Sequence, residues 1–207
     1  MYALIENNEI KKLYNNPRAL KINDVQYPSN IFSIWSKEEK ENIGIYEVEF
    51  NNSNKRDENF YNNTNQSFNF ADGKVTASFG SATAKLLEDR NEVDEAGEPL
   101  LDDKGNQIVT KGLKSQKKAI IKSQASGLLA PTDWYVIKAT DVESYSVPSA
   151  VTTFRADVRT KSNEMETAID NASDVDALAT LYAYVNTGTE ENPVMERPLG
   201  EWPELEV

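Results

Sequence analysis

The residues of this chain that could do chemistry are almost all carboxylates. Its 207 residues include 34 Asp and Glu but no His and no Cys. Without an imidazole or a thiol there is no Ser-His-Asp triad, no thiolate nucleophile, no disulfide and no zinc site built from these ligands. Carboxylates alone can still act as an acid and base pair in glycoside hydrolysis, or bind a hard cation such as Ca²⁺.

Two acidic segments are the best-defined candidates for such chemistry. DEAGEPLL begins at Asp94 and DDKGNQIV begins at Asp102, and they align as a short repeat with a Gly after each acidic pair. Their spacing departs from the EF-hand loop, which ends in a bidentate Glu. We favour a solvated hairpin or an extended linker over 94–109, with a weak cation site as the alternative. With this many carboxylates, some pair must lie at glycosidase spacing by chance, so such a spacing is no evidence for catalysis. We expect no catalytic, metal or cofactor site.

The overall charge narrows the classes of partner. The formal net charge is -12, which argues against a nucleic-acid-binding protein because phosphate affinity requires a concentrated basic surface. No stretch approaches the roughly 20 apolar residues of a membrane span. The N-terminal MYALIENNEIKK lacks a basic lead followed by an apolar run. We therefore expect a protein made and kept in a cytosol, unless a larger assembly carries it outside.

The pattern of elements predicts an α+β fold that begins with a small β-rich module over residues 1–87. Asn and Asp tolerate positive φ, and Gly supplies it, so the polar pairs inside apolar runs predict β-hairpin turns at Asn7-Asn8, Asn23-Asp24 and Asp72-Gly73. Ser36 and Glu39 have the spacing of a helix capping box. Gly44 then ends a short helix, and a strand follows from Ile45.

Residues 113–185 are predicted to be helical. Apolar residues recur at helical spacing from Leu113 to Leu129, with Lys114, Lys118 and Lys122 four apart on another stripe, which indicates a solvated face or a surface for an acidic partner. A second helix begins near Pro148, and a third is capped at Ser173-Asp174. We expect these helices to form an antiparallel three-helix bundle. An acidic hairpin or linker over 88–112 precedes the bundle, and a tail over 186–207 follows it.

Aromatic side chains supply the candidate interaction residues. Trp134 and Tyr135 fall in the predicted connection 131–147, where we expect them to cap the helical core, so Trp134→Ala should cost about 3 to 5 kcal/mol. Tyr and Trp are also enriched at interface hot spots. The candidate anchors of the N-terminal module, whose alternative role is to form its core, are Trp35, Tyr46, Phe60, Tyr61 and Phe68.

The C-terminal motifs carry a resemblance. LLAPTDWYVIK, DVESYSVP and TTFRADVR are similar to the C-terminal region of many bacteriophage tail-fibre assembly and tail-associated proteins. Their pattern of Leu-Leu, Thr-Asp-Trp, Val-Pro and Tyr-Arg-x-x-Leu-Arg falls here on Leu128-Leu129, Thr132-Asp133-Trp134, Val147-Pro148 and Phe154-Arg155-x-x-Val158-Arg159. Phe154 replaces the usual Tyr and Val158 the usual Leu, and both substitutions preserve apolar character.

The N-terminal segment also resembles a known module. MYALIENNEIKKLYNNPRALKINDVQYPSNIFSIWSKEEKENIGIYEV is similar to the leading module of tail-fibre-like proteins of marine phages. The resemblance implies a virion tail component made in the host cytoplasm, such as an adaptor or fibre-attachment protein, that contacts other phage tail or fibre proteins. It also implies a homo-oligomer, or several copies in a symmetric assembly. The alternative is a cytoplasmic tail-fibre assembly chaperone that does not remain in the virion.

Overall fold

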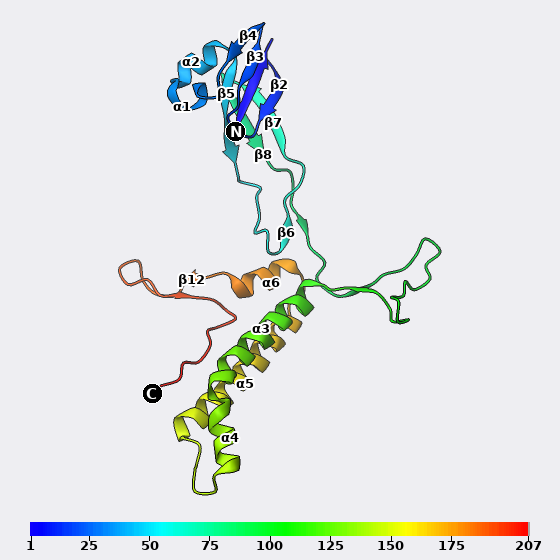
Figure 1. The fold of residues 1–207 in the computed structure, drawn as a ribbon, viewed down its shortest axis with the longest axis vertical. Helices are drawn as coiled ribbons and strands as arrows, with labels where there is room; N and C mark the ends of the chain where they lie inside the picture. The colour runs from blue at the N-terminus through cyan, green and yellow to red at the C-terminus, as the bar shows by residue number, and fades with distance from the viewer. Residues whose placement is uncertain (207) are drawn as a thin grey trace. The chain divides into compact units, whose positions relative to one another are not determined.

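The computed structural model describes residues 1–206 and divides into two compact units, Met1–Thr83 and residues 84–207. The chain is mixed α+β, as expected, with a β-rich N-terminal half and helices in the C-terminal half (Figure 1). The division falls slightly before the expected end of the first module at residue 87. The segments 88–112 and 186–207, which we predicted as segments distinct from the helical domain, belong to the second unit.

The first unit is built on a five-stranded sheet with the strand order β2-β1-β5-β8-β7. All neighbouring strands are antiparallel except β5 and β8, which are parallel. All three predicted hairpins are confirmed, and their Asn, Asp and Gly turn residues have positive φ. The strands of the sheet are β1 (Tyr2–Glu6), β2 (Glu9–Tyr14), β5 (Ile45–Asn51), β7 (Ser67–Ala71) and β8 (Lys74–Ser78).

Shorter elements surround this sheet. β3 (Leu20–Ile22) and β4 (Val25–Tyr27) form a hairpin of their own, followed by α1 (Ile31–Ile34) and α2 (Lys37–Asn42). The predicted capping box of α2 is confirmed: the Glu39 N–H donates to Ser36 Oγ, and the Ser36 N–H donates to a Glu39 carboxylate oxygen. The remaining short strands are β6 (Tyr61–Asn62) and β9 (Thr83–Ala84).

Alternation along the strands divides the core of this unit between the two faces of the sheet. On one face, Leu4 and Ile45 pack against residues of β3 and α1, including Ile31. On the other face, Val48 and Val75 pack together and half-buried aromatic side chains surround them. Gly44 joins α2 to β5 with φ +82°, and a Cβ at this position would lie 2.7 Å from the Ile5 carbonyl oxygen. Only glycine therefore fits this connection.

The second unit contains two long helices that pack against each other, α3 (Leu113–Leu129) and α5 (Ser149–Asp170). The predicted start of α5 after Pro148 is confirmed, and so is the cap of α6 (Val175–Tyr182), where the Asp174 side chain accepts from the Ala177 N–H. The predicted connection 131–147 is wrong for most of its length. A 3-10 turn (Ala130–Thr132) and a further helix, α4 (Asp133–Asp141), occupy it. Pro131 stands early in the 3-10 turn, where its missing N–H removes no hydrogen bond.

The acidic segment forms a projecting arm made of hairpins. β10 (Arg90–Asn91) and β11 (Val109–Thr110) form its stem, and two tight turns follow each other at 94–98 and 102–106. Three residues spaced by eight close a ring of backbone hydrogen bonds: Glu92 N–H donates to the Ile108 carbonyl, Leu100 N–H to Glu92, and Ile108 N–H to Leu100. The Gln107 side-chain amide lies within 3.1 Å of all three carbonyl oxygens. Of the alternatives for 94–109, the structure therefore shows hairpins.

After α6 the chain forms a second small hairpin, β12 (Val185–Asn186) with β13 (Met195–Glu196), and then returns to the helices. Leu199 is buried, and its N–H donates to the Leu181 carbonyl. None of the helices formed by residues 1–206 has the length and apolar character that a membrane crossing requires. In the same part of the chain, no group of three or more Asp or Glu side chains is placed to hold a metal ion.

Candidate protein-interaction surface

Arg155 holds the bend between α3 and α4. Its Nη1 donates to the Leu129 carbonyl at 3.1 Å and to the hydroxyl of Thr132, and it forms an ion pair with Asp133 at 2.7 Å. The Thr132 hydroxyl also donates to the Leu129 carbonyl. Thr132 is 3% exposed and the Arg155 side chain 12% exposed. One guanidinium therefore closes the end of α3 and fixes the first residues of α4, and we call this set of contacts the Arg155 clamp.

The Arg155 clamp explains the spacing of the C-terminal motif. Thr-Asp-Trp and Phe-Arg are distant in sequence, but α5 runs back along α3 and brings Phe154 and Arg155 to the bend. Phe154 is buried in the apolar cluster between α3 and α5, as is Val158 one turn later. Arg159 is exposed, and among the described residues 1–206 its guanidinium donates only to the Arg155 carbonyl of its own helix. The two arginines of the motif thus differ in role, which sequence reasoning did not separate.

The clamp holds α4 so that an apolar side of the helix is exposed to solvent. Trp134 is 50% exposed and Ile137 is 61% exposed, and the two lie three residues apart on one side of the helix. The expectation that Trp134 caps the helical core is therefore wrong. Trp134 is exposed because residues 133–141 form a helix, which turns Tyr135 and Ala139 toward the protein and Trp134 away from it. We call the exposed side chains Trp134 and Ile137 the α4 face.

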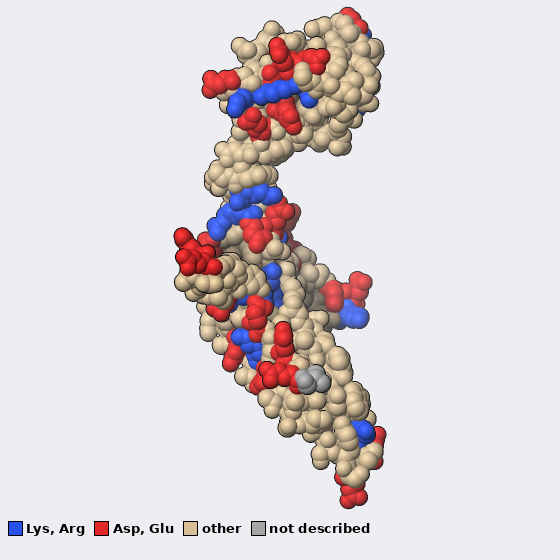
Figure 2. Space-filling model, turned by 90° about the vertical axis from the view of Figure 1, so that its left-hand side faces the viewer, with Lys and Arg blue, Asp and Glu red and all other residues tan. Residues whose placement is uncertain are grey.

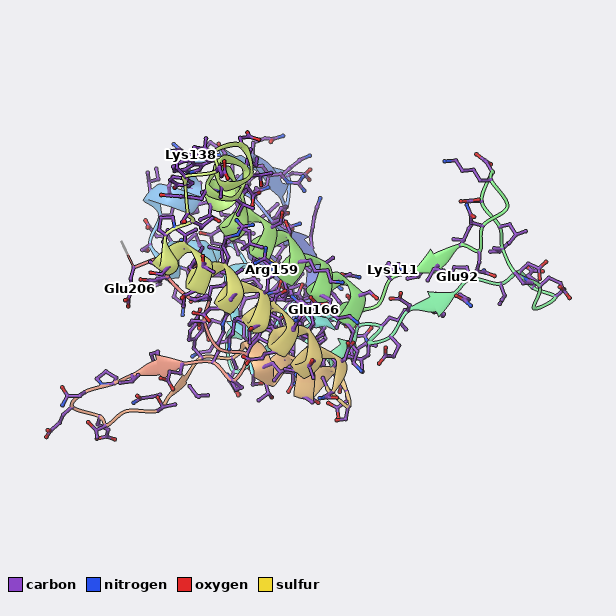
Figure 3. All side chains as sticks on the ribbon, turned by 90° about the horizontal axis from the view of Figure 1, so that it is seen from below. Glu92, Lys111, Lys138, Arg159, Glu166 and Glu206 are labelled. Atoms are coloured by element: carbon purple, nitrogen blue, oxygen red, sulfur yellow. The ribbon has the colours of Figure 1, made fainter. Side chains whose placement is uncertain are left out.

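Aromatic and cationic side chains limit the movement of Trp134. Its ring lies 3.8 Å from that of Tyr135, centroid to centroid. The Lys138 ammonium lies 5.8 Å from the Trp134 ring and 4.2 Å from the ring of Tyr145, in the loop after α4. Figure 3 shows Lys138 at this end of the helical unit. A large side chain that is exposed but held in one orientation is well suited to contact a partner, because little rotamer freedom remains to be lost on binding.

The candidate residues of the first unit are all buried or half-buried. Phe60 and Tyr61 are only 2% and 4% exposed, so the expectation that they are accessible anchors is wrong. Trp35 packs against the α1 cluster and meets the ring of Tyr27 edge-on at 5.8 Å. Half-buried Tyr46 contacts Phe70, with ring centroids 4.9 Å apart, and Phe68 packs beside Val75. Alternating strand positions and an interface patch look alike in sequence, which is why the two could not be separated.

The lysine stripe of α3 pairs within the chain. Lys114 contacts Glu88 at 2.5 Å, and Lys118 and Lys122 contact α5 acids at 2.6 and 3.3 Å. These α5 partners are Asp170 and Glu166, the latter labelled in Figure 3. The hydrogen bond to Asp170 raises the pKa of Lys118. The stripe is thus already matched by acids of its own unit, and a role as a free basic surface is not needed to explain it.

A carboxylate joins the arm to the start of α3. Asp89 accepts from the Gly112 N–H at 2.9 Å and pairs with Lys111 at 2.7 Å. Hydrogen bonds from Lys111, Ser115 and the Gly112 N–H lower the pKa of the Asp89 carboxyl from 3.8 to about 2. Gly112 is the N-cap residue of α3 and has no side chain to cap the helix, so Asp89 supplies that carboxylate from the arm.

Comparison of the chain with family models, with curated proteins and with solved structures gave no match. On the face drawn in Figure 2, Lys and Arg lie interspersed with Asp and Glu. The described residues expose apolar side chains on the α4 face and on the projecting hairpins.

Proposed function

We propose that this chain is a bacteriophage tail-associated structural protein, an adaptor or fibre-attachment component of the virion tail, made in the host cytoplasm. The observation that carries the proposal is the pairing of motif and geometry at α4. Thr132, Asp133 and Arg155, which carry the resemblance to tail-associated proteins, are also the residues of the Arg155 clamp. The residue between them in the motif, Trp134, is half-exposed on the α4 face.

The clamp has the features of a mount for a contact surface. A surface helix held only by apolar packing would bury its largest side chain, whereas α4 leaves Trp134 and Ile137 in solvent. A polar clamp beneath an exposed apolar face makes sense when another protein covers that face. We extend the proposal to the fold of the unit: α3, α5 and α6 act as an antiparallel three-helix bundle that carries α4.

The proposal also covers the partners and the oligomeric state of the chain. The partners are other phage tail or fibre proteins, and several copies of the chain stand in a symmetric assembly as a homo-oligomer. The chain works without a cofactor and not as an enzyme, a nucleic-acid binder or a membrane-spanning protein. The absence of His and Cys from the whole sequence supports a contact function over acid-base or nucleophilic catalysis.

Counting the protein in purified virions tests the proposal. Quantitative mass spectrometry would compare peptides of this chain with those of the major tail-tube protein. A fixed, small copy number per particle is the expected result. If the chain is abundant in infected cells and missing from virions, the structural assignment is wrong, and an assembly chaperone that leaves the fibre becomes the better explanation.

A matched pair of variants tests the part assigned to α4. Ile137→Asp places a charge on the α4 face, and Ile120→Asp places the same charge on an exposed position of α3 outside it. Both isoleucines are largely exposed, so both variants should fold. We expect the copy number in virions to fall for Ile137→Asp and to stay unchanged for Ile120→Asp. Equal incorporation of the two variants would remove α4 from the attachment surface.

A further inference from the structure

The last residues of the described chain lie in an apolar groove between α3 and α5. The groove is formed by Ala125, Leu128, Leu129, Phe154 and Val158, and Trp202 and Leu205 pack into it. The indole N–H of Trp202 donates to the side-chain oxygen of Gln124 at 3.1 Å. We call residues 201–206 the tail segment. Figure 3 labels its last residue, Glu206, near the first turns of α5.

The tail segment is held by few contacts. The last backbone hydrogen bond before it is that of the Gly200 N–H to the Arg197 carbonyl, and within residues 1–206 none joins the tail segment to the helices. Gly200 has φ +77°, a conformation that turns the chain sharply at the start of the segment. Its attachment to α3 and α5 therefore depends on Trp202 and Leu205 and on one side-chain hydrogen bond, whereas Glu201 at its start is held separately by an ion pair with Arg197 at 2.9 Å.

The side of the tail segment that faces α5 is poorly packed. A hollow of about 550 Å³ is lined by α5 residues that include Asp157 and by Pro203, Glu204 and Glu206. A second hollow of about 320 Å³ lies between Trp202 and the next turns of α5. Asp157 shares the larger hollow with Glu204 and Glu206, and like charges facing one hollow repel each other. The groove thus attracts the apolar side chains of the segment, Asp157 opposes Glu204 and Glu206, and Lys161 shares the smaller hollow with Glu201.

We propose that the tail segment is exchangeable, and that the α3–α5 groove of one copy binds the Trp202-to-Leu205 segment of a second copy of this chain. The groove already fits this segment, so the exchanged form makes the same contacts as the closed form and differs mainly in the entropy of joining two chains. Crowding of copies in an assembly offsets that cost by raising the local concentration of tail segments. The inference rests on the proposed function only in assuming that copies of the chain are crowded in an assembly.

Engineered thiols provide the test, because the chain has no Cys of its own. One variant carries Leu128→Cys in the groove, and a second carries Leu205→Cys on the tail segment. An equimolar mixture of the two is incubated at rising protein concentration, oxidised gently and separated on a non-reducing gel. Exchange should yield a disulfide-linked heterodimer that grows with concentration and time.

The control replaces the groove variant with Ser126→Cys, which stands on the exposed side of the same helix. We expect the Leu128→Cys mixture to give at least five times more heterodimer than this control. Equal yields from the two mixtures at millimolar protein would overturn the proposal. Because both variants are studied as purified proteins, this result does not depend on whether the chain is found in virions.

A peptide experiment tests the groove itself. The chain truncated after Gly200 is titrated with the peptide EWPELEV and with EAPELEV, and the full-length Trp202→Ala chain serves as a second acceptor should the truncated one fail to fold. We expect saturable binding of EWPELEV that weakens at least tenfold when Trp is replaced by Ala. If neither acceptor binds EWPELEV, or if both peptides bind equally well, the groove is not a docking site for this segment.

Discussion

Replacing Arg155 with Met tests whether the clamp fixes α4. Met keeps most of the apolar stem but removes the guanidinium, so the Leu129 carbonyl and the Thr132 hydroxyl each lose one charge-assisted hydrogen bond. Thr132 is buried and still donates to Leu129, so neither group is left wholly without a partner. Hydrogen bonds to charged groups contribute roughly 1.5 kcal/mol each at the lower end of their range. The ion pair to Asp133 adds little, because the Asp133 side chain is 54% exposed.

Two such bonds give an expected loss of about 3 kcal/mol for Arg155→Met. For a unit of this size, that corresponds to a fall in Tm of roughly 9 to 18 °C. Thermal unfolding of the full chain, followed by circular dichroism at 222 nm, reports mainly on the helices of the second unit. Arg159→Met is the matched control, since Arg159 is exposed and within residues 1–206 donates only to its own helix, and it should change Tm by no more than about 2 °C.

Two results would refute the clamp. Equal Tm values for Arg155→Met and Arg159→Met would show that the contacts at the bend do not stabilise the fold. Full retention of stability by Arg155→Lys would also count against the clamp, because all three contacts are made by Nη1, which lies one bond farther from the backbone than the Nζ of Lys. A double-mutant cycle of Arg155→Met with Thr132→Val should give a coupling of about 1 kcal/mol.

Three further outcomes follow from the structure. Trp134→Ala should lower stability by only about 1 kcal/mol, measured by urea unfolding, because the ring is half-exposed and its main neighbour is Tyr135. The pKa of Asp89 is lower in the folded chain than in the unfolded chain. The contribution of Asp89 to stability is therefore complete above the unfolded pKa and is lost as pH falls toward about 2. In acid unfolding, the stability difference between the wild type and Asp89→Asn should shrink between pH 5 and pH 2. Gly44→Ala should cost at least about 2 kcal/mol and Gly73→Ala about 1 kcal/mol, because both have positive φ but only the Gly44 Cβ would meet a backbone oxygen. Indistinguishable melting curves for these two glycine variants would contradict the clash at Ile5.

The local signals in the sequence predicted the elements well because each depends on neighbouring residues. Turn residues with positive φ fixed the three hairpins, and the capping box at Ser36 fixed α2. α4 was missed because Pro131 and Asp133 indicate a turn, and nothing local shows that Arg155, brought back by α5, supplies the hydrogen bonds that let the helical path continue. The fate of Trp134 depended on that helix.

Interaction residues were harder to predict than elements. An amphipathic strand and a contact patch both present aromatic side chains at regular spacing, so the burial of Phe60 and Tyr61 could be learned only from the fold. The lysine stripe of α3 posed the same difficulty. Its partners Asp170 and Glu166 lie far away in sequence on α5, and only the pairing of the two helices brings them within ion-pair distance. Long-range partners decide which surface residues remain free.

The hydrogen-bonded ring in the arm should keep the base of the two turns stable whatever the length of the turns. The backbone groups of Glu92, Leu100 and Ile108 bond to one another, and the Gln107 amide donates to their three carbonyls. The turns at 94–98 and 102–106 therefore lie outside the closed ring. Either turn, seen at the end of the green arm in Figure 1, could therefore carry an inserted peptide while the ring keeps its ends together. An epitope tag or a small fluorescent label placed between Asp94 and Glu98 would mark the protein without touching the α4 face.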